Sequence, residues 1–286
     1  MKRYFVACLF LSIIGVALLG TSCRKKHSLS GDNEIKFDSV RITAIQYLFN
    51  DTTKPNCNLD LQFVYPAAYK NKKILDSIRV WFIECFFGKE YSTFSPEQAA
   101  DRFKADYLAE YKNVEKEYSD DQARNADEEF VPVSWYSYYL TGNVKIEFNK
   151  NDLLCFLVYN DIYNGGEHGV HSYLYYTLNL ETGERLTEKD IFKEDYQEEL
   201  SNLLVTALEK QNNVSSREEL SDLGYVGAIE LLSNDNFIIG EEGITYLYNE
   251  YEIASYLMGA VKIFIPYSSM KEILKPGTSV AELAGM

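Results

Sequence analysis

Two spacings of apolar residues constrain the fold of this chain more than any other feature. Around residue 40 and again around residue 60, every second residue is apolar, as in a strand with one buried face. From residue 72 to residue 87 the apolar residues instead lie three and four positions apart, which predicts a helix that ends at Gly88. The same reasoning predicts strands near residues 40–47, 59–65, 144–148, 153–159, 170–180, 237–239, 244–248 and 260–265.

Residues that cap helices mark further helix starts at Ser95, Thr187 and Ser216, and another apolar stripe predicts a helix around residues 200–208. A closing helix is expected from Ser268 or Ser269, followed by a capping box that starts at Ser279. Strands that come in runs with few helices between them indicate an α+β fold, with mainly antiparallel sheets packed against a few helices.

The overall composition is that of a folded protein. The chain has 286 residues, of which 46% are hydrophobic and 25% charged, which excludes wholesale disorder, collagen and a polytopic membrane protein. Lys and Arg number 28 against 43 Asp and Glu, so the net charge is −15. An acidic chain gains nothing from releasing counterions of a polyphosphate, so no nucleic-acid partner is expected.

The N-terminal segment has the pattern of a lipoprotein signal peptide. Lys2 and Arg3 precede an apolar stretch of 16 residues, and small residues come directly before Cys23. The stretch is shorter than the roughly 20 residues of a membrane-spanning helix. We therefore predict cleavage after residue 22 and lipidation of Cys23, which anchors the protein on the extracytoplasmic side of a bacterial membrane, either facing the periplasm or at the cell surface. Loss of the two basic residues makes the net charge −17.

The remaining chain is predicted to have four parts. Residues 23–35 are polar and form a tether. A strand-helix subdomain covers residues 36–118, and a C-terminal α+β domain covers residues 133–286. Between them, the acidic residues 119–132 are expected to form a loop. Three cysteines remain after lipidation, an odd and sparse set that excludes a disulfide scaffold.

No catalytic constellation is found along the chain. His168 and His171 invite a metal site, but residues three apart on a strand point to opposite faces, and Glu167 and His171 are about 13 Å apart at 3.3 Å per residue. The nearest approach to a nucleophile elbow, around Ser279, lacks its final glycine. We therefore expect no enzyme, no metal and no cofactor. The alternative is an envelope glycan hydrolase or deacetylase-associated enzyme that uses carboxylates or a histidine metal site.

Tyrosine is over-represented, with 23 residues. The tyrosines gather at residues 135–139, 173–176 and 246–248. In a sheet, half of each cluster is expected to face the core and the other half to face outward or toward a helix, and the alternative is that most of them are packed sheet aromatics. Exposed tyrosines provide large contact area at a low entropy cost, which suits the binding of a protein or a glycan.

Two stretches resemble a known family. Residues 163–192 contain Tyr-Asn-Gly-Gly-Glu-His-Gly, a tyrosine-rich strand and Leu-Glu-Thr-Gly-Glu-Arg-Leu-Thr-Glu-Lys-Asp, and residues 244–267 repeat the tyrosine-rich character. Together they resemble the domain-of-unknown-function family 3298, over roughly residues 138–274. The preceding region is similar to that family's usual 4163-type N-terminal companion. The family occurs in the extracytoplasmic domain of lysozyme-sensing anti-sigma factors and beside the catalytic domain of some peptidoglycan deacetylases.

The resemblance implies an extracytoplasmic module that binds or senses a component of the cell envelope, with a lysozyme-like protein or a cell-wall glycan as partner. A lipobox stands in place of the sensors' cytoplasmic sigma-binding segment and membrane helix, and we expect no deacetylase domain, so neither parent activity is carried over. We expect the contact in the loop at residues 163–169 and in the strand that follows it. The candidate binding residues are Tyr163, Asn164, Gly165, Gly166, Glu167, His168, Tyr173, Tyr175 and Tyr176.

Overall fold

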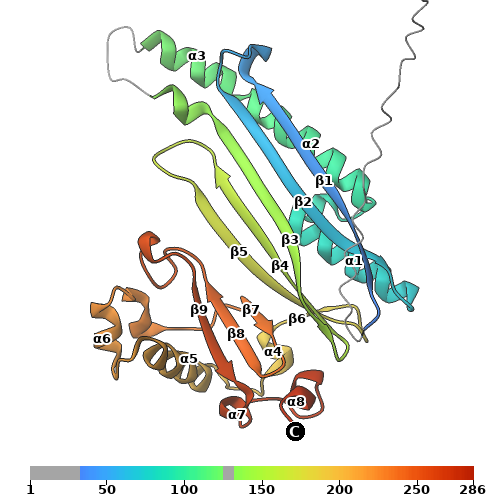
Figure 1. The fold of residues 1–286 in the computed structure, drawn as a ribbon, viewed down its shortest axis with the longest axis vertical. Coiled ribbons are helices and arrows are strands. Elements are labelled where there is room, and N and C mark those ends of the chain that lie inside the picture. The colour runs from blue at the N-terminus through green and yellow to red at the C-terminus, as the bar shows by residue number, and fades with distance from the viewer. Residues whose placement is uncertain (1–32, 125–131) are drawn as a thin grey trace, which may run out of the picture.

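The structure, a computed structural model, describes residues 33–124 and 132–286. Its largest element is a sheet of six strands in the order β1 to β6 (Figure 1). Neighbouring strands are antiparallel except β2 and β3, which run parallel. The strands are β1 (Lys36–Tyr47), β2 (Asn56–Ala68), β3 (Tyr138–Lys150), β4 (Leu153–Tyr163), β5 (Val170–Asn179) and β6 (Arg185–Leu186).

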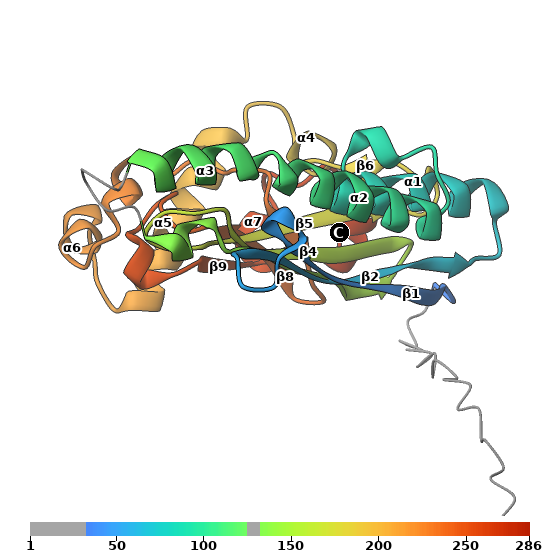
Figure 2. The same cartoon turned by 90° about the horizontal axis from the view of Figure 1, so that it is seen from above.

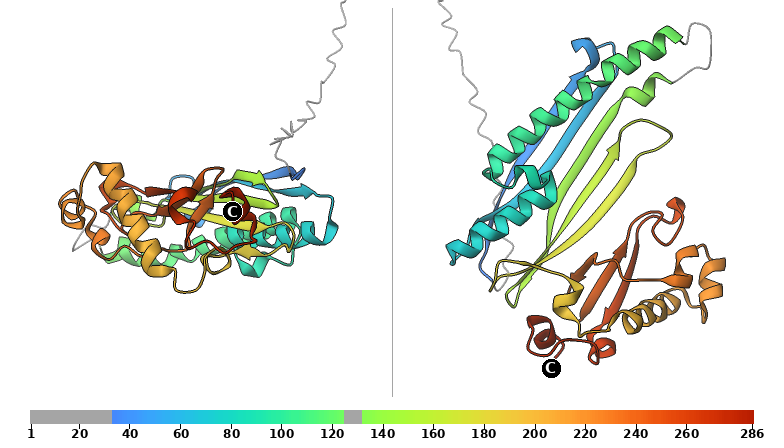
Figure 3. Two further views of the ribbon diagram at one scale, coloured as in Figure 1. Left: turned by 90° about the horizontal axis from the view of Figure 1, so that it is seen from below. Right: turned by 180° about the vertical axis from the view of Figure 1, so that it is seen from behind.

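Three helices connect the two parallel strands and cover one face of the sheet (Figure 2). They are α1 (Lys72–Phe87), α2 (Pro96–Lys112) and α3 (Val114–Arg124), and α2 and α3 follow one another along nearly one line (Figure 3). Aromatic rings fill the space between α1 and the sheet, where the ring centroids of Phe82 and Phe156 lie 4.0 Å apart. Both rings are fully buried, so this layer has its own apolar core.

A second, smaller sheet lies beside the β5 and β6 edge of the first (Figure 1). Its antiparallel strands are β7 (Phe237–Ile239), β8 (Gly243–Tyr248) and β9 (Val261–Pro266). The helices around it are α4 (Glu188–Ile191), α5 (Gln197–Asn212), α6 (Arg217–Asp222), α7 (Tyr267–Met270) and α8 (Ser279–Leu283). Its core includes Leu153 and Cys155 of the large sheet, so the two sheets share buried contacts.

Two asparagines of the smaller unit satisfy the free edge of β5. Asn249 accepts a hydrogen bond from the backbone N–H of Tyr173 at 2.7 Å and donates one to its carbonyl at 3.1 Å. Asn236 accepts from the backbone N–H of Tyr175 at 2.7 Å. These side chains replace the neighbouring strand that β5 lacks at this point, which closes an otherwise open sheet edge.

The predicted fold class is confirmed, and several local predictions hold. Helix α1 has the predicted bounds: Asn71 caps its start, and Gly88 ends it with a φ of +118°. Helix α2 starts at the predicted position, where Ser95 and Gln98 form a capping box. Asn151 and Asp152 both have positive φ, as a tight turn between β3 and β4 requires.

Two helix starts differ from the prediction. Helix α7 begins at Tyr267 directly after Pro266, without a serine cap, and it ends at Met270. At α8 the capping side chain is Thr278, whose Oγ1 accepts from the backbone N–H of Ala281, and Ser279 is already helical. The α8 shift is one residue and arises because the neighbouring hydroxyls of Thr278 and Ser279 offer equivalent caps to a sequence pattern, whereas α7 follows Pro266 and uses no side-chain cap.

The chain is also divided differently from the prediction. Strands β2 and β3 come from the two separate parts that were expected, residues 36–118 and 133–286, yet they are paired in one sheet. Residues 119–124 of the expected acidic loop are helical and belong to α3, while residues 125–131 lie outside the described part. The acidic residues there occupy exposed positions of a helix, which satisfies the same polar pattern as a loop.

The signal peptide, Cys23 and most of the tether lie outside the described residues. Within residues 33–124 and 132–286, no helix is both long enough and apolar enough to cross a bilayer.

Candidate functional site

The predicted binding loop joins β4 to β5. A hydrogen bond within the loop stabilises it: the hydroxyl of Tyr163, its first residue, donates to the Gly166 carbonyl at 2.7 Å. Gly165 has a φ of +95°, and a Cβ added there would lie 2.8 Å from the carbonyl oxygen of Trp135. Glycine is required at this position by both the backbone angle and the close contact. The loop is therefore held against the start of β3.

His168 connects this loop to a second one, residues 249–258, which joins β8 to β9. Its ring stacks on Tyr256 with 4.6 Å between centroids and an interplanar angle of 23°. Its Nε2 lies 3.4 Å from the hydroxyl of Tyr251, and its Nδ1 lies 2.9 Å from the Gly169 carbonyl. His168 is exposed, so the stack lies on the surface of the protein. Two loops more than 80 residues apart in the chain thus form one surface.

His171 of β5, the strand after the first loop, makes a second connection to the loop at residues 249–258. Its Nδ1 lies 2.8 Å from a carboxylate oxygen of Glu250, and its Nε2 lies 3.7 Å from Asp161, which accepts from the Tyr139 hydroxyl at 3.1 Å. The two carboxylates thus lie near different nitrogens of the ring. Among the described residues, no group of three or more His, Cys, Asp or Glu side chains is placed to hold a metal ion.

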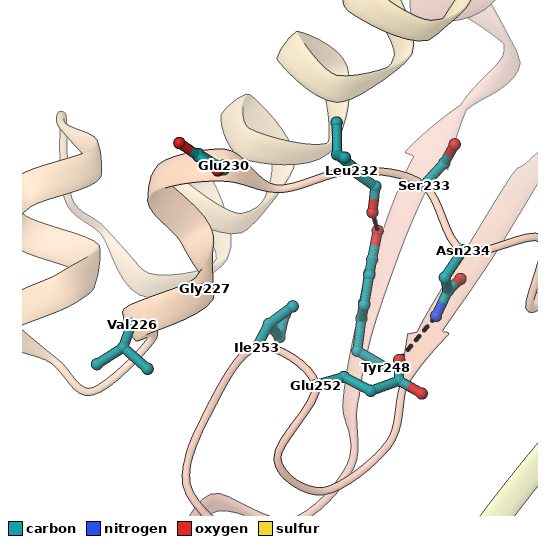
Figure 4. Close-up of a pocket in the computed structure, with 9 residues that line it drawn as sticks. All are labelled: Val226, Gly227, Glu230, Leu232, Ser233, Asn234, Tyr248, Glu252 and Ile253. Carbon is teal, nitrogen blue, oxygen red and sulfur yellow. Dashed lines mark hydrogen bonds between the residues drawn. The ribbon is translucent and has the colours of Figure 1, made fainter.

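A cavity of about 560 Å³ lies beside the second loop (Figure 4). Val226, Leu232 and Ile253 give it apolar walls, and Tyr248 crosses it to donate a hydrogen bond to the Leu232 carbonyl at 2.8 Å. Glu252, also on the wall, accepts from Asn234 at 2.9 Å. The cavity therefore combines apolar walls with a carboxylate whose position is fixed by a neighbouring amide.

Large apolar side chains are exposed on the segments that form this cavity. Leu257 is 94% exposed, Val226 69% and Leu232 67%. Tyr251 and Leu223 are also more than half exposed. The segments that carry them touch one another, since the Gly227 backbone N–H donates to the Ile253 carbonyl at 3.1 Å. We call residues 163–169, 223–232 and 249–258 together the loop surface, and exposed apolar residues gathered in this way are typical of an interaction site.

The predicted residues are divided between this surface and the core. Glu167 and His168 are exposed on the loop surface, and Asn164 is exposed on the other side of the same loop. Tyr173 is half-buried, with its ring 4.8 Å from that of Tyr159. Tyr176 points toward the helices and stacks on Phe156 at 5.3 Å.

Tyr175 is 5% exposed, and Lys262 of β9 lies 5.9 Å from its ring centroid. Tyr175 and Tyr176 are therefore core residues, which corrects their assignment as contact residues. The smaller sheet covers Tyr175 on one face of β5, and α1 covers the opposite face, toward which Tyr176 points. Neither face of β5 is therefore free here. The sequence prediction missed residues 223–232 and 249–258. In the sequence Leu257 lies between Tyr256 and Met258, as in an ordinary apolar segment, so no local signal marks it as exposed.

The protein thus belongs to the α+β class and has two sheets, and a loop from each sheet contributes to the loop surface. Residues 189–268 match the family model described as "Protein of unknown function (DUF3298)". A DUF3298 family member from Bacteroides fragilis has a crystal structure that matches with a TM-score of 0.82 and 32% sequence identity, over 89% of this chain and 99% of that one. The chain therefore belongs to the DUF3298 family.

A DUF3298 family protein from Pseudomonas aeruginosa PAO1 matches with a TM-score of 0.58 and 12% identity, over 85% of this chain and 96% of that one. At this identity the likeness concerns the fold alone. No curated protein matches this chain.

Proposed function

We propose that this protein is an extracytoplasmic binding module, lipid-anchored through Cys23, that recognises a basic, lysozyme-like protein of the cell envelope through its loop surface. The observation that carries this proposal is the set of exposed apolar residues on the segments that form the 560 Å³ cavity. Leaving Leu257 94% exposed costs solvation free energy with no benefit to folding. A partner that covers it recovers that free energy.

Charge favours a cationic partner for this surface. Glu230 and Glu252 line the cavity, and Glu167 lies on the neighbouring loop. The whole chain has a net charge of −15, so long-range attraction adds to the local complementarity. Apolar contacts at the centre and carboxylates at the rim match the usual anatomy of a protein–protein interface.

The hydrogen bonds made by the polar groups at the cavity also agree with a binding role. The hydroxyl of Ser233 donates to Glu188 at 2.7 Å, away from the carboxylate of Glu252. Glu252 itself is engaged by Asn234. Since serine and carboxylate are each held by other partners, they do not form a nucleophile and a base. We therefore propose that the protein is not an enzyme.

The test is a calorimetric titration of the protein with lysozymes and with peptidoglycan fragments at 50 and 150 mM salt. Leu257→Ser and Val226→Ser should each weaken lysozyme binding about tenfold, because both side chains lose buried apolar contacts. Ile45→Ser is the matched control, since Ile45 is 59% exposed on β1, away from the loop surface. Unchanged binding by both loop variants, or attraction that disappears at 150 mM salt, contradicts the proposal.

A further inference from the structure

A second cavity, of about 450 Å³, lies where α2 passes into α3 above the first residues of β3. Three tyrosines, two glutamates and Asn164 contribute to its lining. Its walls come from segments far apart in the chain: α2, α3, β3 and the loop after β4. The cavity is therefore a product of the tertiary structure, and none of its residues except Asn164 was predicted to bind anything.

The tyrosine rings form an angled wall. The centroids of Tyr111 and Tyr138 lie 5.2 Å apart, and their planes are inclined at 59°. Tyr107 is fixed beside them by stacking on Phe103, with 5.7 Å between centroids and 19° between planes. The face of a tyrosine ring is electron-rich, so a cavity lined by three tyrosines favours a cation.

One polar atom in this wall has no partner. The Tyr107 hydroxyl oxygen is buried and forms no hydrogen bond within the described part of the chain. Burial raises the pKa of this phenol, so it remains an uncharged hydroxyl that accepts and donates hydrogen bonds. A buried hydroxyl without a partner loses free energy, and a ligand with an N–H group would restore the missing bond.

The charges at the opening have a single sign. Glu110 and Glu117 line the cavity and are both exposed, whereas none of the nine lining residues is a lysine or an arginine. No cation of the cavity wall therefore neutralises them. Aromatic rings with carboxylates at the rim favour an organic cation over a neutral sugar or an anion.

We infer that this cavity binds the ammonium group of a lysine side chain. The alkyl stem would lie against the rings, and the ammonium would donate to the Tyr107 hydroxyl and to the carboxylates of Glu110 and Glu117. This deepens the proposed function, since a basic partner supplies the lysine. The cavity shares only Asn164 with the loop surface, so each is tested by its own variants.

The test uses the full-length protein in detergent and small probes. Nα-acetyl-lysine amide is titrated against it by calorimetry at 150 mM salt, with Nα-acetyl-norleucine amide as the uncharged probe and glucosamine as an alternative ammonium source. The lysine amide should bind at millimolar concentration, and the norleucine amide should bind at least tenfold more weakly. Equal binding of both amides, or binding of glucosamine without lysine amide, overturns the assignment.

Three variants locate the site. The double variant Glu110→Gln/Glu117→Gln should weaken lysine amide binding about tenfold, while Glu181→Gln/Glu184→Gln, on an exposed turn, removes the same charge and should leave it unchanged. Tyr107→Phe should weaken binding several-fold without lowering the unfolding temperature, because the lost hydroxyl has no partner.

Equal loss of binding in both double variants would mean nonspecific attraction and overturns the inference. Leu257→Ser, which tests the loop surface, should not affect lysine amide binding. If only the cavity variants keep wild-type binding of lysine amide, the inference about the cavity is refuted. If only the loop variants keep wild-type binding of lysozyme, the proposed protein-binding surface is refuted.

Discussion

Glu188 is a buried carboxylate that ties α4 to the segment preceding β7, and its removal gives a sharp test of the structure. It is 6% exposed. Its carboxylate accepts hydrogen bonds from the hydroxyl of Ser233 at 2.7 Å, the hydroxyl of Tyr196 at 2.9 Å and the backbone N–H of Asp235 at 3.0 Å. Asp235 returns a bond by accepting from the Glu188 backbone N–H at 2.8 Å.

The Glu188→Ala variant should lose about 3 kcal/mol of unfolding free energy. Each of the three bonds involves a charged acceptor and is worth about 1.5–3 kcal/mol, but burying the carboxylate itself costs several kcal/mol. The net loss arises mainly because the hydroxyls of Tyr196 and Ser233 are left without their acceptor. Glu188→Gln should cost less, about 1–2 kcal/mol, because the amide retains an acceptor oxygen of similar position.

Urea unfolding followed by far-UV circular dichroism measures both changes. The midpoint should fall in the order wild type, Glu188→Gln, Glu188→Ala, with an unchanged m value. Glu181→Ala, at an exposed turn position, serves as the control and should stay within about 0.5 kcal/mol of wild type. A Glu188→Ala variant as stable as this control would refute the network as a stabilising element.

Three further outcomes follow from burial and from the predicted anchor. Burial raises the pKa of Cys57 and Cys155 to about 11 and that of Cys85 to about 12. These thiols should therefore react with Ellman's reagent at pH 8 much more slowly in the folded protein than in urea. Equal reaction rates in the two conditions would contradict the packing. Burial also raises the pKa of Tyr159 to about 12, so its stabilising contribution is present below the unfolded value near 10 and is lost as pH rises toward 12. Spectrophotometric titration at 295 nm should therefore show a group of late-titrating tyrosines that merges with the rest in urea. Finally, Cys23→Ala should release the protein from membranes on fractionation, whereas Cys57→Ala should not; membrane retention of unacylated Cys23→Ala would refute the lipid anchor.

The sequence by itself determined the local elements, because their signals lie within a few residues. The spacing of apolar residues and the glycine at residue 88 together predicted the bounds of α1 that the structure shows. The turn at Asn151 and Asp152 is specified in the same way, by residues that tolerate positive φ. The fold class follows from the order of such elements.

Tertiary structure decided which side chains reach a surface. The tyrosines of β5 alternate as predicted, but the pattern left open whether the second half faces solvent or a helix, and the structure covers Tyr175 with the smaller sheet and the opposite face with α1. Likewise, His168 was a candidate from its loop alone, but its stacking partner Tyr256 lies 88 residues further along the chain. Contacts of that range depend on how strands pair and sheets pack, and a periodic pattern of apolar residues does not encode them. The loop surface and the tyrosine cavity both arise from such contacts.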